Sequence, residues 1–212
     1  MRPQGRRPIL TPRNLADFVQ FAHNVQCIQD PARPLLLKNP YDLPNFLYLR
    51  RAFSTARFIF VHRNPVQVIN SQIIAIGSIL QARNEYELLM VERMRKLYES
   101  PIKLAMARAL YCGKLPLLYW QVSRNIAACC DYVVAHMSQL GDSAISVTYP
   151  ELCRDPRGEV DKILRFLGAT DRSGQDYSTR IHSRNQPLLP IVERHKEAIE
   201  HRNQSFCRSF QV

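Results

Sequence analysis

The sequence predicts an α/β fold in which a mostly parallel sheet is flanked by helices. Short apolar segments rich in β-branched and aromatic residues alternate with longer segments of helical periodicity. The strongest of the short segments runs directly into an Asn-Pro pair, which is typical of a helix start. The chain has 212 residues, 46% of them apolar and 22% charged, so it can bury a substantial core. We therefore expect residues 1–212 to form a single domain.

The first part of the chain is predicted to form a helix, a strand and a second helix. Residues 14–28 have the periodicity of an amphipathic helix capped by Asn14, with one apolar face: Leu15, Phe18, Val19, Ala22 and Val25. Leu35–Lys38 is a short apolar run that ends in a charge, which indicates a buried parallel strand. Asp42 can cap a helix that extends to about Phe53.

The clearest strand and the clearest helix follow one another. Residues 57–62 are rich in aromatic and β-branched side chains and predict a strand. Asn64 and Pro65 then provide a cap and a proline at the first helical position. The helix behind them has a buried stripe, with apolar residues at steps of three and four: Val66, Ile69, Ile73, Ile76 and Leu80.

Residues 84–138 are predicted to be helical throughout, in three segments separated near Pro101 and near residues 113–116. Asn84 and Glu87 resemble a capping box at the start of the first segment.

One more strand and two more helices complete the pattern. Residues 144–148 predict a strand, and Asp155-Pro156 opens a helix that Gly168 ends. Residues 171–190 have a loop-like composition, and a polar helix is expected from about Ile191. Three strands are few for a parallel sheet, so we expect that a further strand of the fold is missing from the sequence.

The composition limits the classes of function. The formal net charge is +11, but Lys and Arg are spread over the chain without a long basic tract, so we do not expect a nucleic-acid-binding protein. The excess charge suits either a solvated surface or an anionic cofactor. There is no run of 18 or more uncharged apolar residues, so no membrane span is expected.

The cysteines and the N-terminus indicate a cytoplasmic protein without a metal site. The six cysteines show no CxxC pair and no Cys/His ligand spacing, so we expect reduced thiols. The basic residues 1–7 are not followed by an apolar segment, as a secretory signal would require. A lumenal parent protein with an N-terminal anchor is the alternative.

The chemistry of the chain is expected at the end of the strand predicted for residues 57–62. Arg63 lies at that strand end, the following helix offers N–H groups, and Ser71 follows eight residues after Arg63. Together these groups could hold an anion. Taken alone, the pattern favours a simpler interpretation, with Arg63 as a surface ion-pair partner and Ser71 as a neutral helix residue.

Two motifs, one after the other along the chain, resemble the core of PAPS-dependent sulfotransferases. The first comprises Leu35–Tyr41 (LLLKNPY), Phe53–Pro65 (FSTARFIFVHRNP) and Ser71. The second comprises Val147–Pro156 (VTYPELCRDP) and Ile163–Gly168 (ILRFLG). The likeness covers about residues 33–168 and is closest to bacterial sulfotransferase-family proteins and tyrosylprotein sulfotransferases. It implies a P-loop-NTPase-like parallel sheet flanked by helices, with residues 171–212 as a C-terminal loop and helix.

The resemblance also implies roles for four residues. Arg63 and Ser71 would bind the 3′-phosphate of PAPS, and Tyr149 would pack against the nucleotide. Lys38 would be the catalytic residue, because its ammonium would face the sulfuryl group and stabilise charge on the leaving oxygen. The simpler alternatives are a half-buried tyrosine and a solvated lysine. No metal is implied.

The sequence departs from the family at the donor site. Nothing before Lys38 resembles the glycine-rich phosphosulfate loop that follows the family's first strand. No acceptor-activating base can be assigned, because strand alternation turns His62 away from Arg63. Arg180 and Arg184 lie where the family's C-terminal loop reaches the 3′-phosphate.

We therefore expect a protein that transfers a sulfuryl group from PAPS to an unknown hydroxyl or amine acceptor. We also expect the chain as written to be inactive, because half of the donor site has no match. The alternative is a non-catalytic remnant of the fold that binds an anionic nucleotide or an acidic partner.

Overall fold

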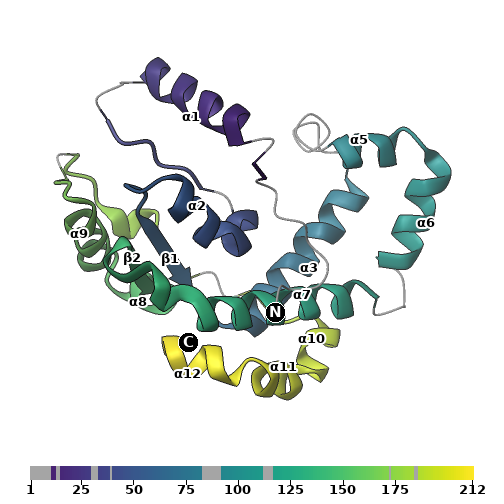
Figure 1. Cartoon of the computed structure of the whole chain (residues 1–212). Helices are drawn as coiled ribbons and strands as arrows, with labels where there is room; N and C mark the ends of the chain where they lie inside the picture. The colour runs from purple at the N-terminus through teal and green to yellow at the C-terminus, as the bar shows by residue number, and fades with distance from the viewer. Residues whose placement is uncertain are drawn as a thin grey trace.

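Two parallel strands form the sheet in the computed structural model, β1 (Phe58–His62) and β2 (Ala144–Thr148). Phe58 lies opposite Ala144 and His62 opposite Thr148, so both strands end at the same edge. The structure describes residues 11–12, 15–29, 33–38, 40–82, 92–111, 117–171, 173–183 and 186–212. Within these residues the fold is a mostly helical α/β arrangement around a small parallel sheet, as Figure 1 shows.

The helices surround and extend the sheet. Before β2 they are α1 (Leu15–Gln29), the 3₁₀ helix η1 (Pro40–Asn45), α2 (Phe46–Ala52), α3 (Pro65–Gln81), α5 (Glu92–Tyr98), α6 (Pro101–Tyr111), α7 (Leu117–His136) and the 3₁₀ helix η2 (Met137–Ser143). After β2 they are α8 (Tyr149–Arg154), α9 (Pro156–Leu167), the 3₁₀ helix η3 (Tyr177–Thr179), α10 (Pro190–Arg194), α11 (Lys196–Arg202) and α12 (Gln204–Phe210). None of the described helices is long and apolar enough to cross a membrane.

Helix α7 joins two hydrophobic cores. Its first half packs with α3 and with α10 and α11, in a cluster built around these buried residues: Val66, Ile69, Val122, Val192 and Ile199. Its second half packs with β1, α2 and α12 in another cluster: Phe46, Phe60, Cys130, Val133 and Phe206. The C-terminal helices therefore run along α7 and close both cores, as Figure 1 shows for the yellow segment.

Several predictions from local signals are confirmed. Helix α3 begins at Pro65, with the Asn64 side chain accepting a hydrogen bond from the Val66 N–H at 2.9 Å. Helix α9 is capped by Asp155 and ends at Gly168, whose φ of 69° is left-handed. Glycine suits that position because it has no Cβ to clash with the backbone.

The prediction of a strand at Leu35–Lys38 is wrong. Residues 34–38 belong to no strand or helix, and Leu36 and Leu37 are 79% and 48% exposed. A strand needs a neighbour that takes up its backbone hydrogen bonds. Within the described residues β1 pairs only with β2, so the apolar run has no sheet partner.

Three other boundaries differ from the predictions. The helix expected over 42–53 begins as the 3₁₀ helix η1, and the polar helix expected after Ile191 is divided into α10, α11 and α12. Residues 149–154 form the short helix α8, where no helix was predicted. Asn84 and Glu87 lie outside the described residues.

Candidate anion-binding site

The two strand ends bring Arg63 and Tyr149 together. Arg63 follows β1 directly and Tyr149 follows β2 directly, and the parallel register places them side by side. The guanidinium carbon of Arg63 lies 4.5 Å from the centroid of the Tyr149 ring. This is the geometry of a cation–π contact, worth about 0.5–2 kcal/mol depending on burial. The ring therefore orients the guanidinium over the carboxyl edge of the sheet.

The Arg63 guanidinium is not neutralised by any residue that the structure describes. Within the described part of the chain, its guanidinium makes no hydrogen bond or ion pair, although the side chain is half-buried. By contrast, Arg157 and Arg202 are paired with carboxylates. A guanidinium has five N–H donors in a planar fork that matches phosphate and carboxylate oxygens. Arg63 is thus a half-buried cation available to an anion.

The helix that follows does not supply free amides, contrary to the expectation from the sequence. Pro65 has no N–H, and the Val66 N–H is bonded to the Asn64 side chain. The N–H groups of Gln67 and Val68 both donate to the Asn64 carbonyl oxygen, at 3.0 and 3.1 Å. The cap that starts α3 occupies the donors that an anion would otherwise use. Binding at this edge therefore depends on side chains.

Ser71 and Lys38 lie in different surroundings. Ser71 is half-buried on α3, and about 9 Å of helix axis separates it from Pro65. Lys38 is exposed at the end of the extended segment 33–38. Among the residues that the structure describes, no hydrogen bond or ion pair joins Lys38 to Arg63 or Tyr149. The structure thus brings together two of the four residues predicted for the site.

A C-terminal segment also reaches this edge. The Tyr149 hydroxyl donates to the carbonyl oxygen of His182 at 3.4 Å. Arg180 is exposed on the same segment, and Arg184 lies outside the described residues. This segment therefore contacts the strand edge through His182, and the roles of Arg180 and Arg184 stay predictions.

Asn70 is a contact residue that the sequence analysis missed. Its side chain, 1% exposed, donates to the Pro187 carbonyl oxygen at 3.1 Å and accepts from the Leu189 N–H at 2.9 Å. A signal was present, because Asn70 lies on the same helical face as Val66 and Ile73. A polar side chain within an apolar stripe indicates a buried hydrogen-bond partner.

His62 faces away from the site, as strand alternation predicts. It is 4% exposed and stacks on the Phe210 ring at 3.8 Å between ring centroids. Its Nε2 lies 2.9 Å from the Ser146 hydroxyl oxygen. Burial lowers the pKa of His62 from 6.5 to about 4. This histidine belongs to the core beneath β1 and is not available to an acceptor at the strand edge.

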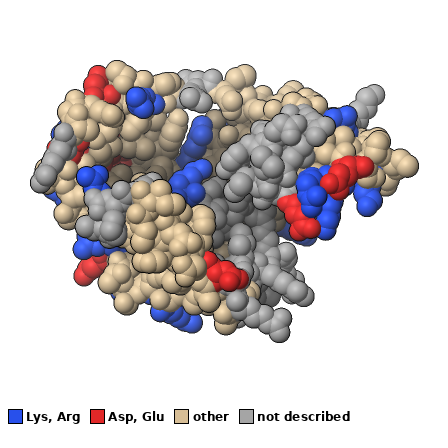
Figure 2. Space-filling view, turned by 90° about the horizontal axis from the view of Figure 1, so that it is seen from above, with Lys and Arg blue, Asp and Glu red and all other residues tan. Residues whose placement is uncertain are grey.

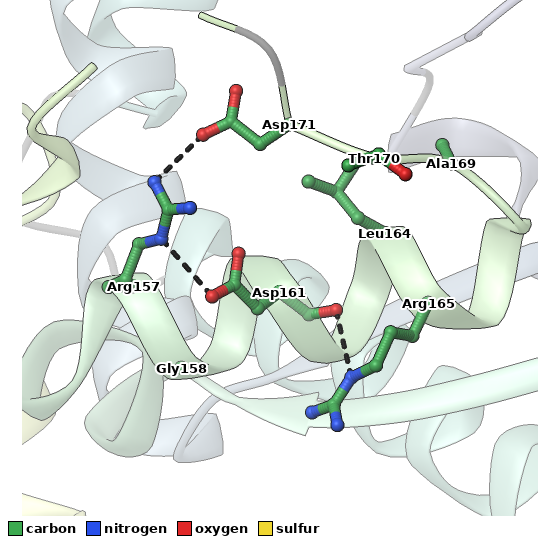
Figure 3. Close-up of a pocket in the computed structure, with 8 residues that line it drawn as sticks. All are labelled: Arg157, Gly158, Asp161, Leu164, Arg165, Ala169, Thr170 and Asp171. Carbon is green, nitrogen blue, oxygen red and sulfur yellow. Dashed lines mark hydrogen bonds and ion pairs between the residues drawn. The ribbon is translucent and has the colours of Figure 1, made fainter. Parts of the chain in front are cut away.

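A separate pocket of about 410 Å³ lies along α9, lined by Arg157, Gly158, Asp161, Leu164, Arg165, Ala169, Thr170 and Asp171. Figure 3 shows the Arg157 guanidinium between the carboxylates of Asp161 and Asp171, at 3.1 and 2.8 Å. The Arg165 side chain donates to the Asp161 carbonyl oxygen. Because these two carboxylates already neutralise Arg157, we expect this pocket to bind an anion more weakly than the strand edge does.

The surface is basic beyond the site. The formal net charge is +11, and Figure 2 shows Lys and Arg side chains spread over one face, some of them inside its hollow. Such a field raises the local concentration of anionic ligands. The described residues include no group of three or more His, Cys, Asp or Glu that could hold a metal ion.

Residues 11–172 match the model of a family described as the sulfotransferase family. This match includes both strands, Arg63 and Tyr149. No curated protein and no solved structure matches the chain significantly.

Proposed function

The chain belongs to the sulfotransferase family, and on that premise we propose that it transfers a sulfuryl group from PAPS to a hydroxyl or amine acceptor. The observation that carries the proposal is the half-buried guanidinium of Arg63, held over Tyr149 at the sheet edge and paired with no carboxylate among the described residues. We propose that it binds the 3′-phosphate of the donor. A P-loop-like sheet would place this edge beside the donor.

The electrostatics support a phosphate at Arg63. A phosphate monoester carries a charge of about −1.5 to −2 at neutral pH and three acceptor oxygens. A guanidinium can contact two of those oxygens at once, and such charge-assisted bonds are about twice as strong as neutral ones. Stacking on Tyr149 limits the rotation of the fork, so less side-chain entropy is lost on binding. The Ser71 hydroxyl would add a neutral donor to the same anion.

The reaction needs stabilisation of one leaving oxygen. The bond between the sulfur and the bridging phosphate oxygen breaks, a bond between the sulfur and the acceptor oxygen or nitrogen forms, and the acceptor proton passes to a base. The second product is adenosine 3′,5′-bisphosphate, and negative charge grows on its 5′-phosphate. We propose that the Lys38 ammonium stabilises that charge.

One observation favours a second candidate function, a non-catalytic protein that binds an anionic nucleotide. Lys38 is exposed and no described contact joins it to Arg63. Binding of an anion at Arg63 would therefore not require a contact with Lys38. A transfer assay with labelled PAPS, run on a protein to which the phosphosulfate loop has been restored, distinguishes the two candidates, because only the first predicts a labelled acceptor.

The binding proposal is tested by calorimetry with adenosine 3′,5′-bisphosphate and adenosine 5′-monophosphate. The bisphosphate should bind more tightly, and Arg63→Ala should weaken its binding about tenfold or more, since a hydrogen bond to a charged group contributes roughly 1.5–3 kcal/mol. Arg154→Ala is a matched control, because Arg154 is an exposed cation on α8 near the same edge. Equal affinity for the two nucleotides would overturn the assignment.

A further inference from the structure

The C-terminal segment is held at two points that flank the proposed nucleotide site. At one point the His182 carbonyl oxygen accepts from Tyr149, whose ring carries the Arg63 guanidinium. At the other point Pro187 and Leu189 are bonded to Asn70, the neighbour of Ser71 on α3. Two described parts of the C-terminal chain thus make contacts, one with the strand edge and the other with the helix that carries the proposed hydroxyl donor.

The Asn70 side chain takes the place of a backbone hydrogen-bond partner for residues 187–189. One amide group supplies a donor to Pro187 and an acceptor to Leu189, as a neighbouring strand would. The side chain is 1% exposed, so water cannot replace either bond. Leu188 and Leu189 pack against the core between α3 and α7, which brings the backbone within reach of the amide. The position of this segment is therefore determined by Asn70 together with apolar packing.

We infer that Asn70 is a positioning residue for the nucleotide site. Asn70 holds residues 187–189 against α3, and chain connectivity then limits how far His182, five residues before Pro187, can move from Tyr149. Tyr149 in turn orients Arg63. This inference rests on the proposed function, in which Arg63 binds the 3′-phosphate. Asn70 itself touches no nucleotide in this scheme.

The chemistry of the amide suggests a sharp test with Asn70→Asp. An ionised carboxylate accepts the Leu189 N–H but cannot donate to the Pro187 carbonyl oxygen. A protonated carboxyl regains one donor and one acceptor and so reproduces the amide pattern. Burial beside a carbonyl favours the protonated form, so the variant should regain its contact as the pH is lowered. A residue that only filled space would not show this recovery.

The experiment measures the affinity for adenosine 3′,5′-bisphosphate by calorimetry between pH 8 and pH 6. At pH 8, Asn70→Asp should bind the bisphosphate about tenfold more weakly than the wild type. The ratio of the Kd of the variant to the Kd of the wild type should approach one as the pH falls. The control is Gln72→Glu, which places the same charge change on an exposed position of α3. For this control, the ratio of its Kd to the wild-type Kd should stay constant between pH 8 and pH 6. Equal binding at pH 8, or a deficit that does not change with pH, would overturn the role of Asn70.

A second pair of variants decides the question if Asn70→Asp does not fold. Leu189 has a φ of −62°, which proline adopts, so Leu189→Pro removes the N–H donor without changing the backbone angle. Leu189→Ala also removes the packing of the leucine side chain, by at least as much as proline does, but keeps the N–H. The proline variant should bind the bisphosphate several-fold more weakly than the alanine variant, and equal affinities would refute the inference. If the wild type does not prefer the bisphosphate to adenosine 5′-monophosphate, the proposed function and the role of Asn70 both fail.

Discussion

The buried histidine beneath β1 predicts how the stability of the fold depends on pH. His62 is 4% exposed, stacks on Phe210 and lies 2.9 Å from the Ser146 hydroxyl. Burial lowers its pKa from 6.5 to about 4, because the charged imidazolium is poorly solvated in the core. The perturbation is a decrease from pH 7.5 to pH 5, applied to the wild type and to His62→Phe.

The magnitude follows from the two pKa values. In the unfolded chain the imidazole gains its proton near pH 6.5, whereas in the folded chain it does so only near pH 4. Above pH 6.5 the histidine is neutral in both states and has no effect. As the pH falls toward 4, the unfolded state binds the proton more strongly and stability is lost. At pH 5 the linkage relation gives a loss of about 2 kcal/mol in the free energy of unfolding.

Urea denaturation at the two pH values measures this loss. The wild type should lose about 2 kcal/mol more than His62→Phe, which keeps an aromatic ring against Phe210 without a titrating group. His201→Gln is the control, because His201 is exposed on α11. The reasoning would be refuted if the wild type and His62→Phe lost the same stability between pH 7.5 and pH 5.

Two further predictions concern catalysis and local backbone. In a protein that also carries the phosphosulfate loop, Lys38→Ala should lower kcat about a hundredfold in a PAPS transfer assay. It should change the affinity for adenosine 3′,5′-bisphosphate little, because the charge that the ammonium meets develops only in the transition state. If Lys38→Ala kept a near-normal kcat, Lys38 would be only a solvated side chain with no catalytic role. Gly168→Ala should lower the free energy of unfolding by about 1 kcal/mol, since its φ is 69°, whereas Gly77→Ala, with open space around its Cβ position within α3, should raise it by about 0.5–1 kcal/mol. If the denaturant midpoints of the two variants shifted in the same direction, the argument from the φ angles of the two glycines would be contradicted.

The candidate site was predictable in part. Arg63 at the strand end and Tyr149 after the second strand were named from the sequence, and the structure joins them through a 4.5 Å contact. Asn70 was missed, since its two partners lie more than a hundred residues further along the chain. The free helix amides expected after Arg63 are taken up by Asn64, a competition that the Asn-Pro pair already implied.

The sequence by itself determined the features that depend on a few neighbouring residues. The starts of α3 and α9, the end of α9 at Gly168 and the two strands are specified by caps, a left-handed glycine and β-branched runs. Only the tertiary structure decided what depends on distant partners. Leu35–Lys38 is apolar enough for a strand, but strand formation requires a neighbour, and none of the described segments pairs with it. Arg63 meets Tyr149 for the same kind of reason, because the parallel register of β1 and β2 brings their carboxyl ends to one edge.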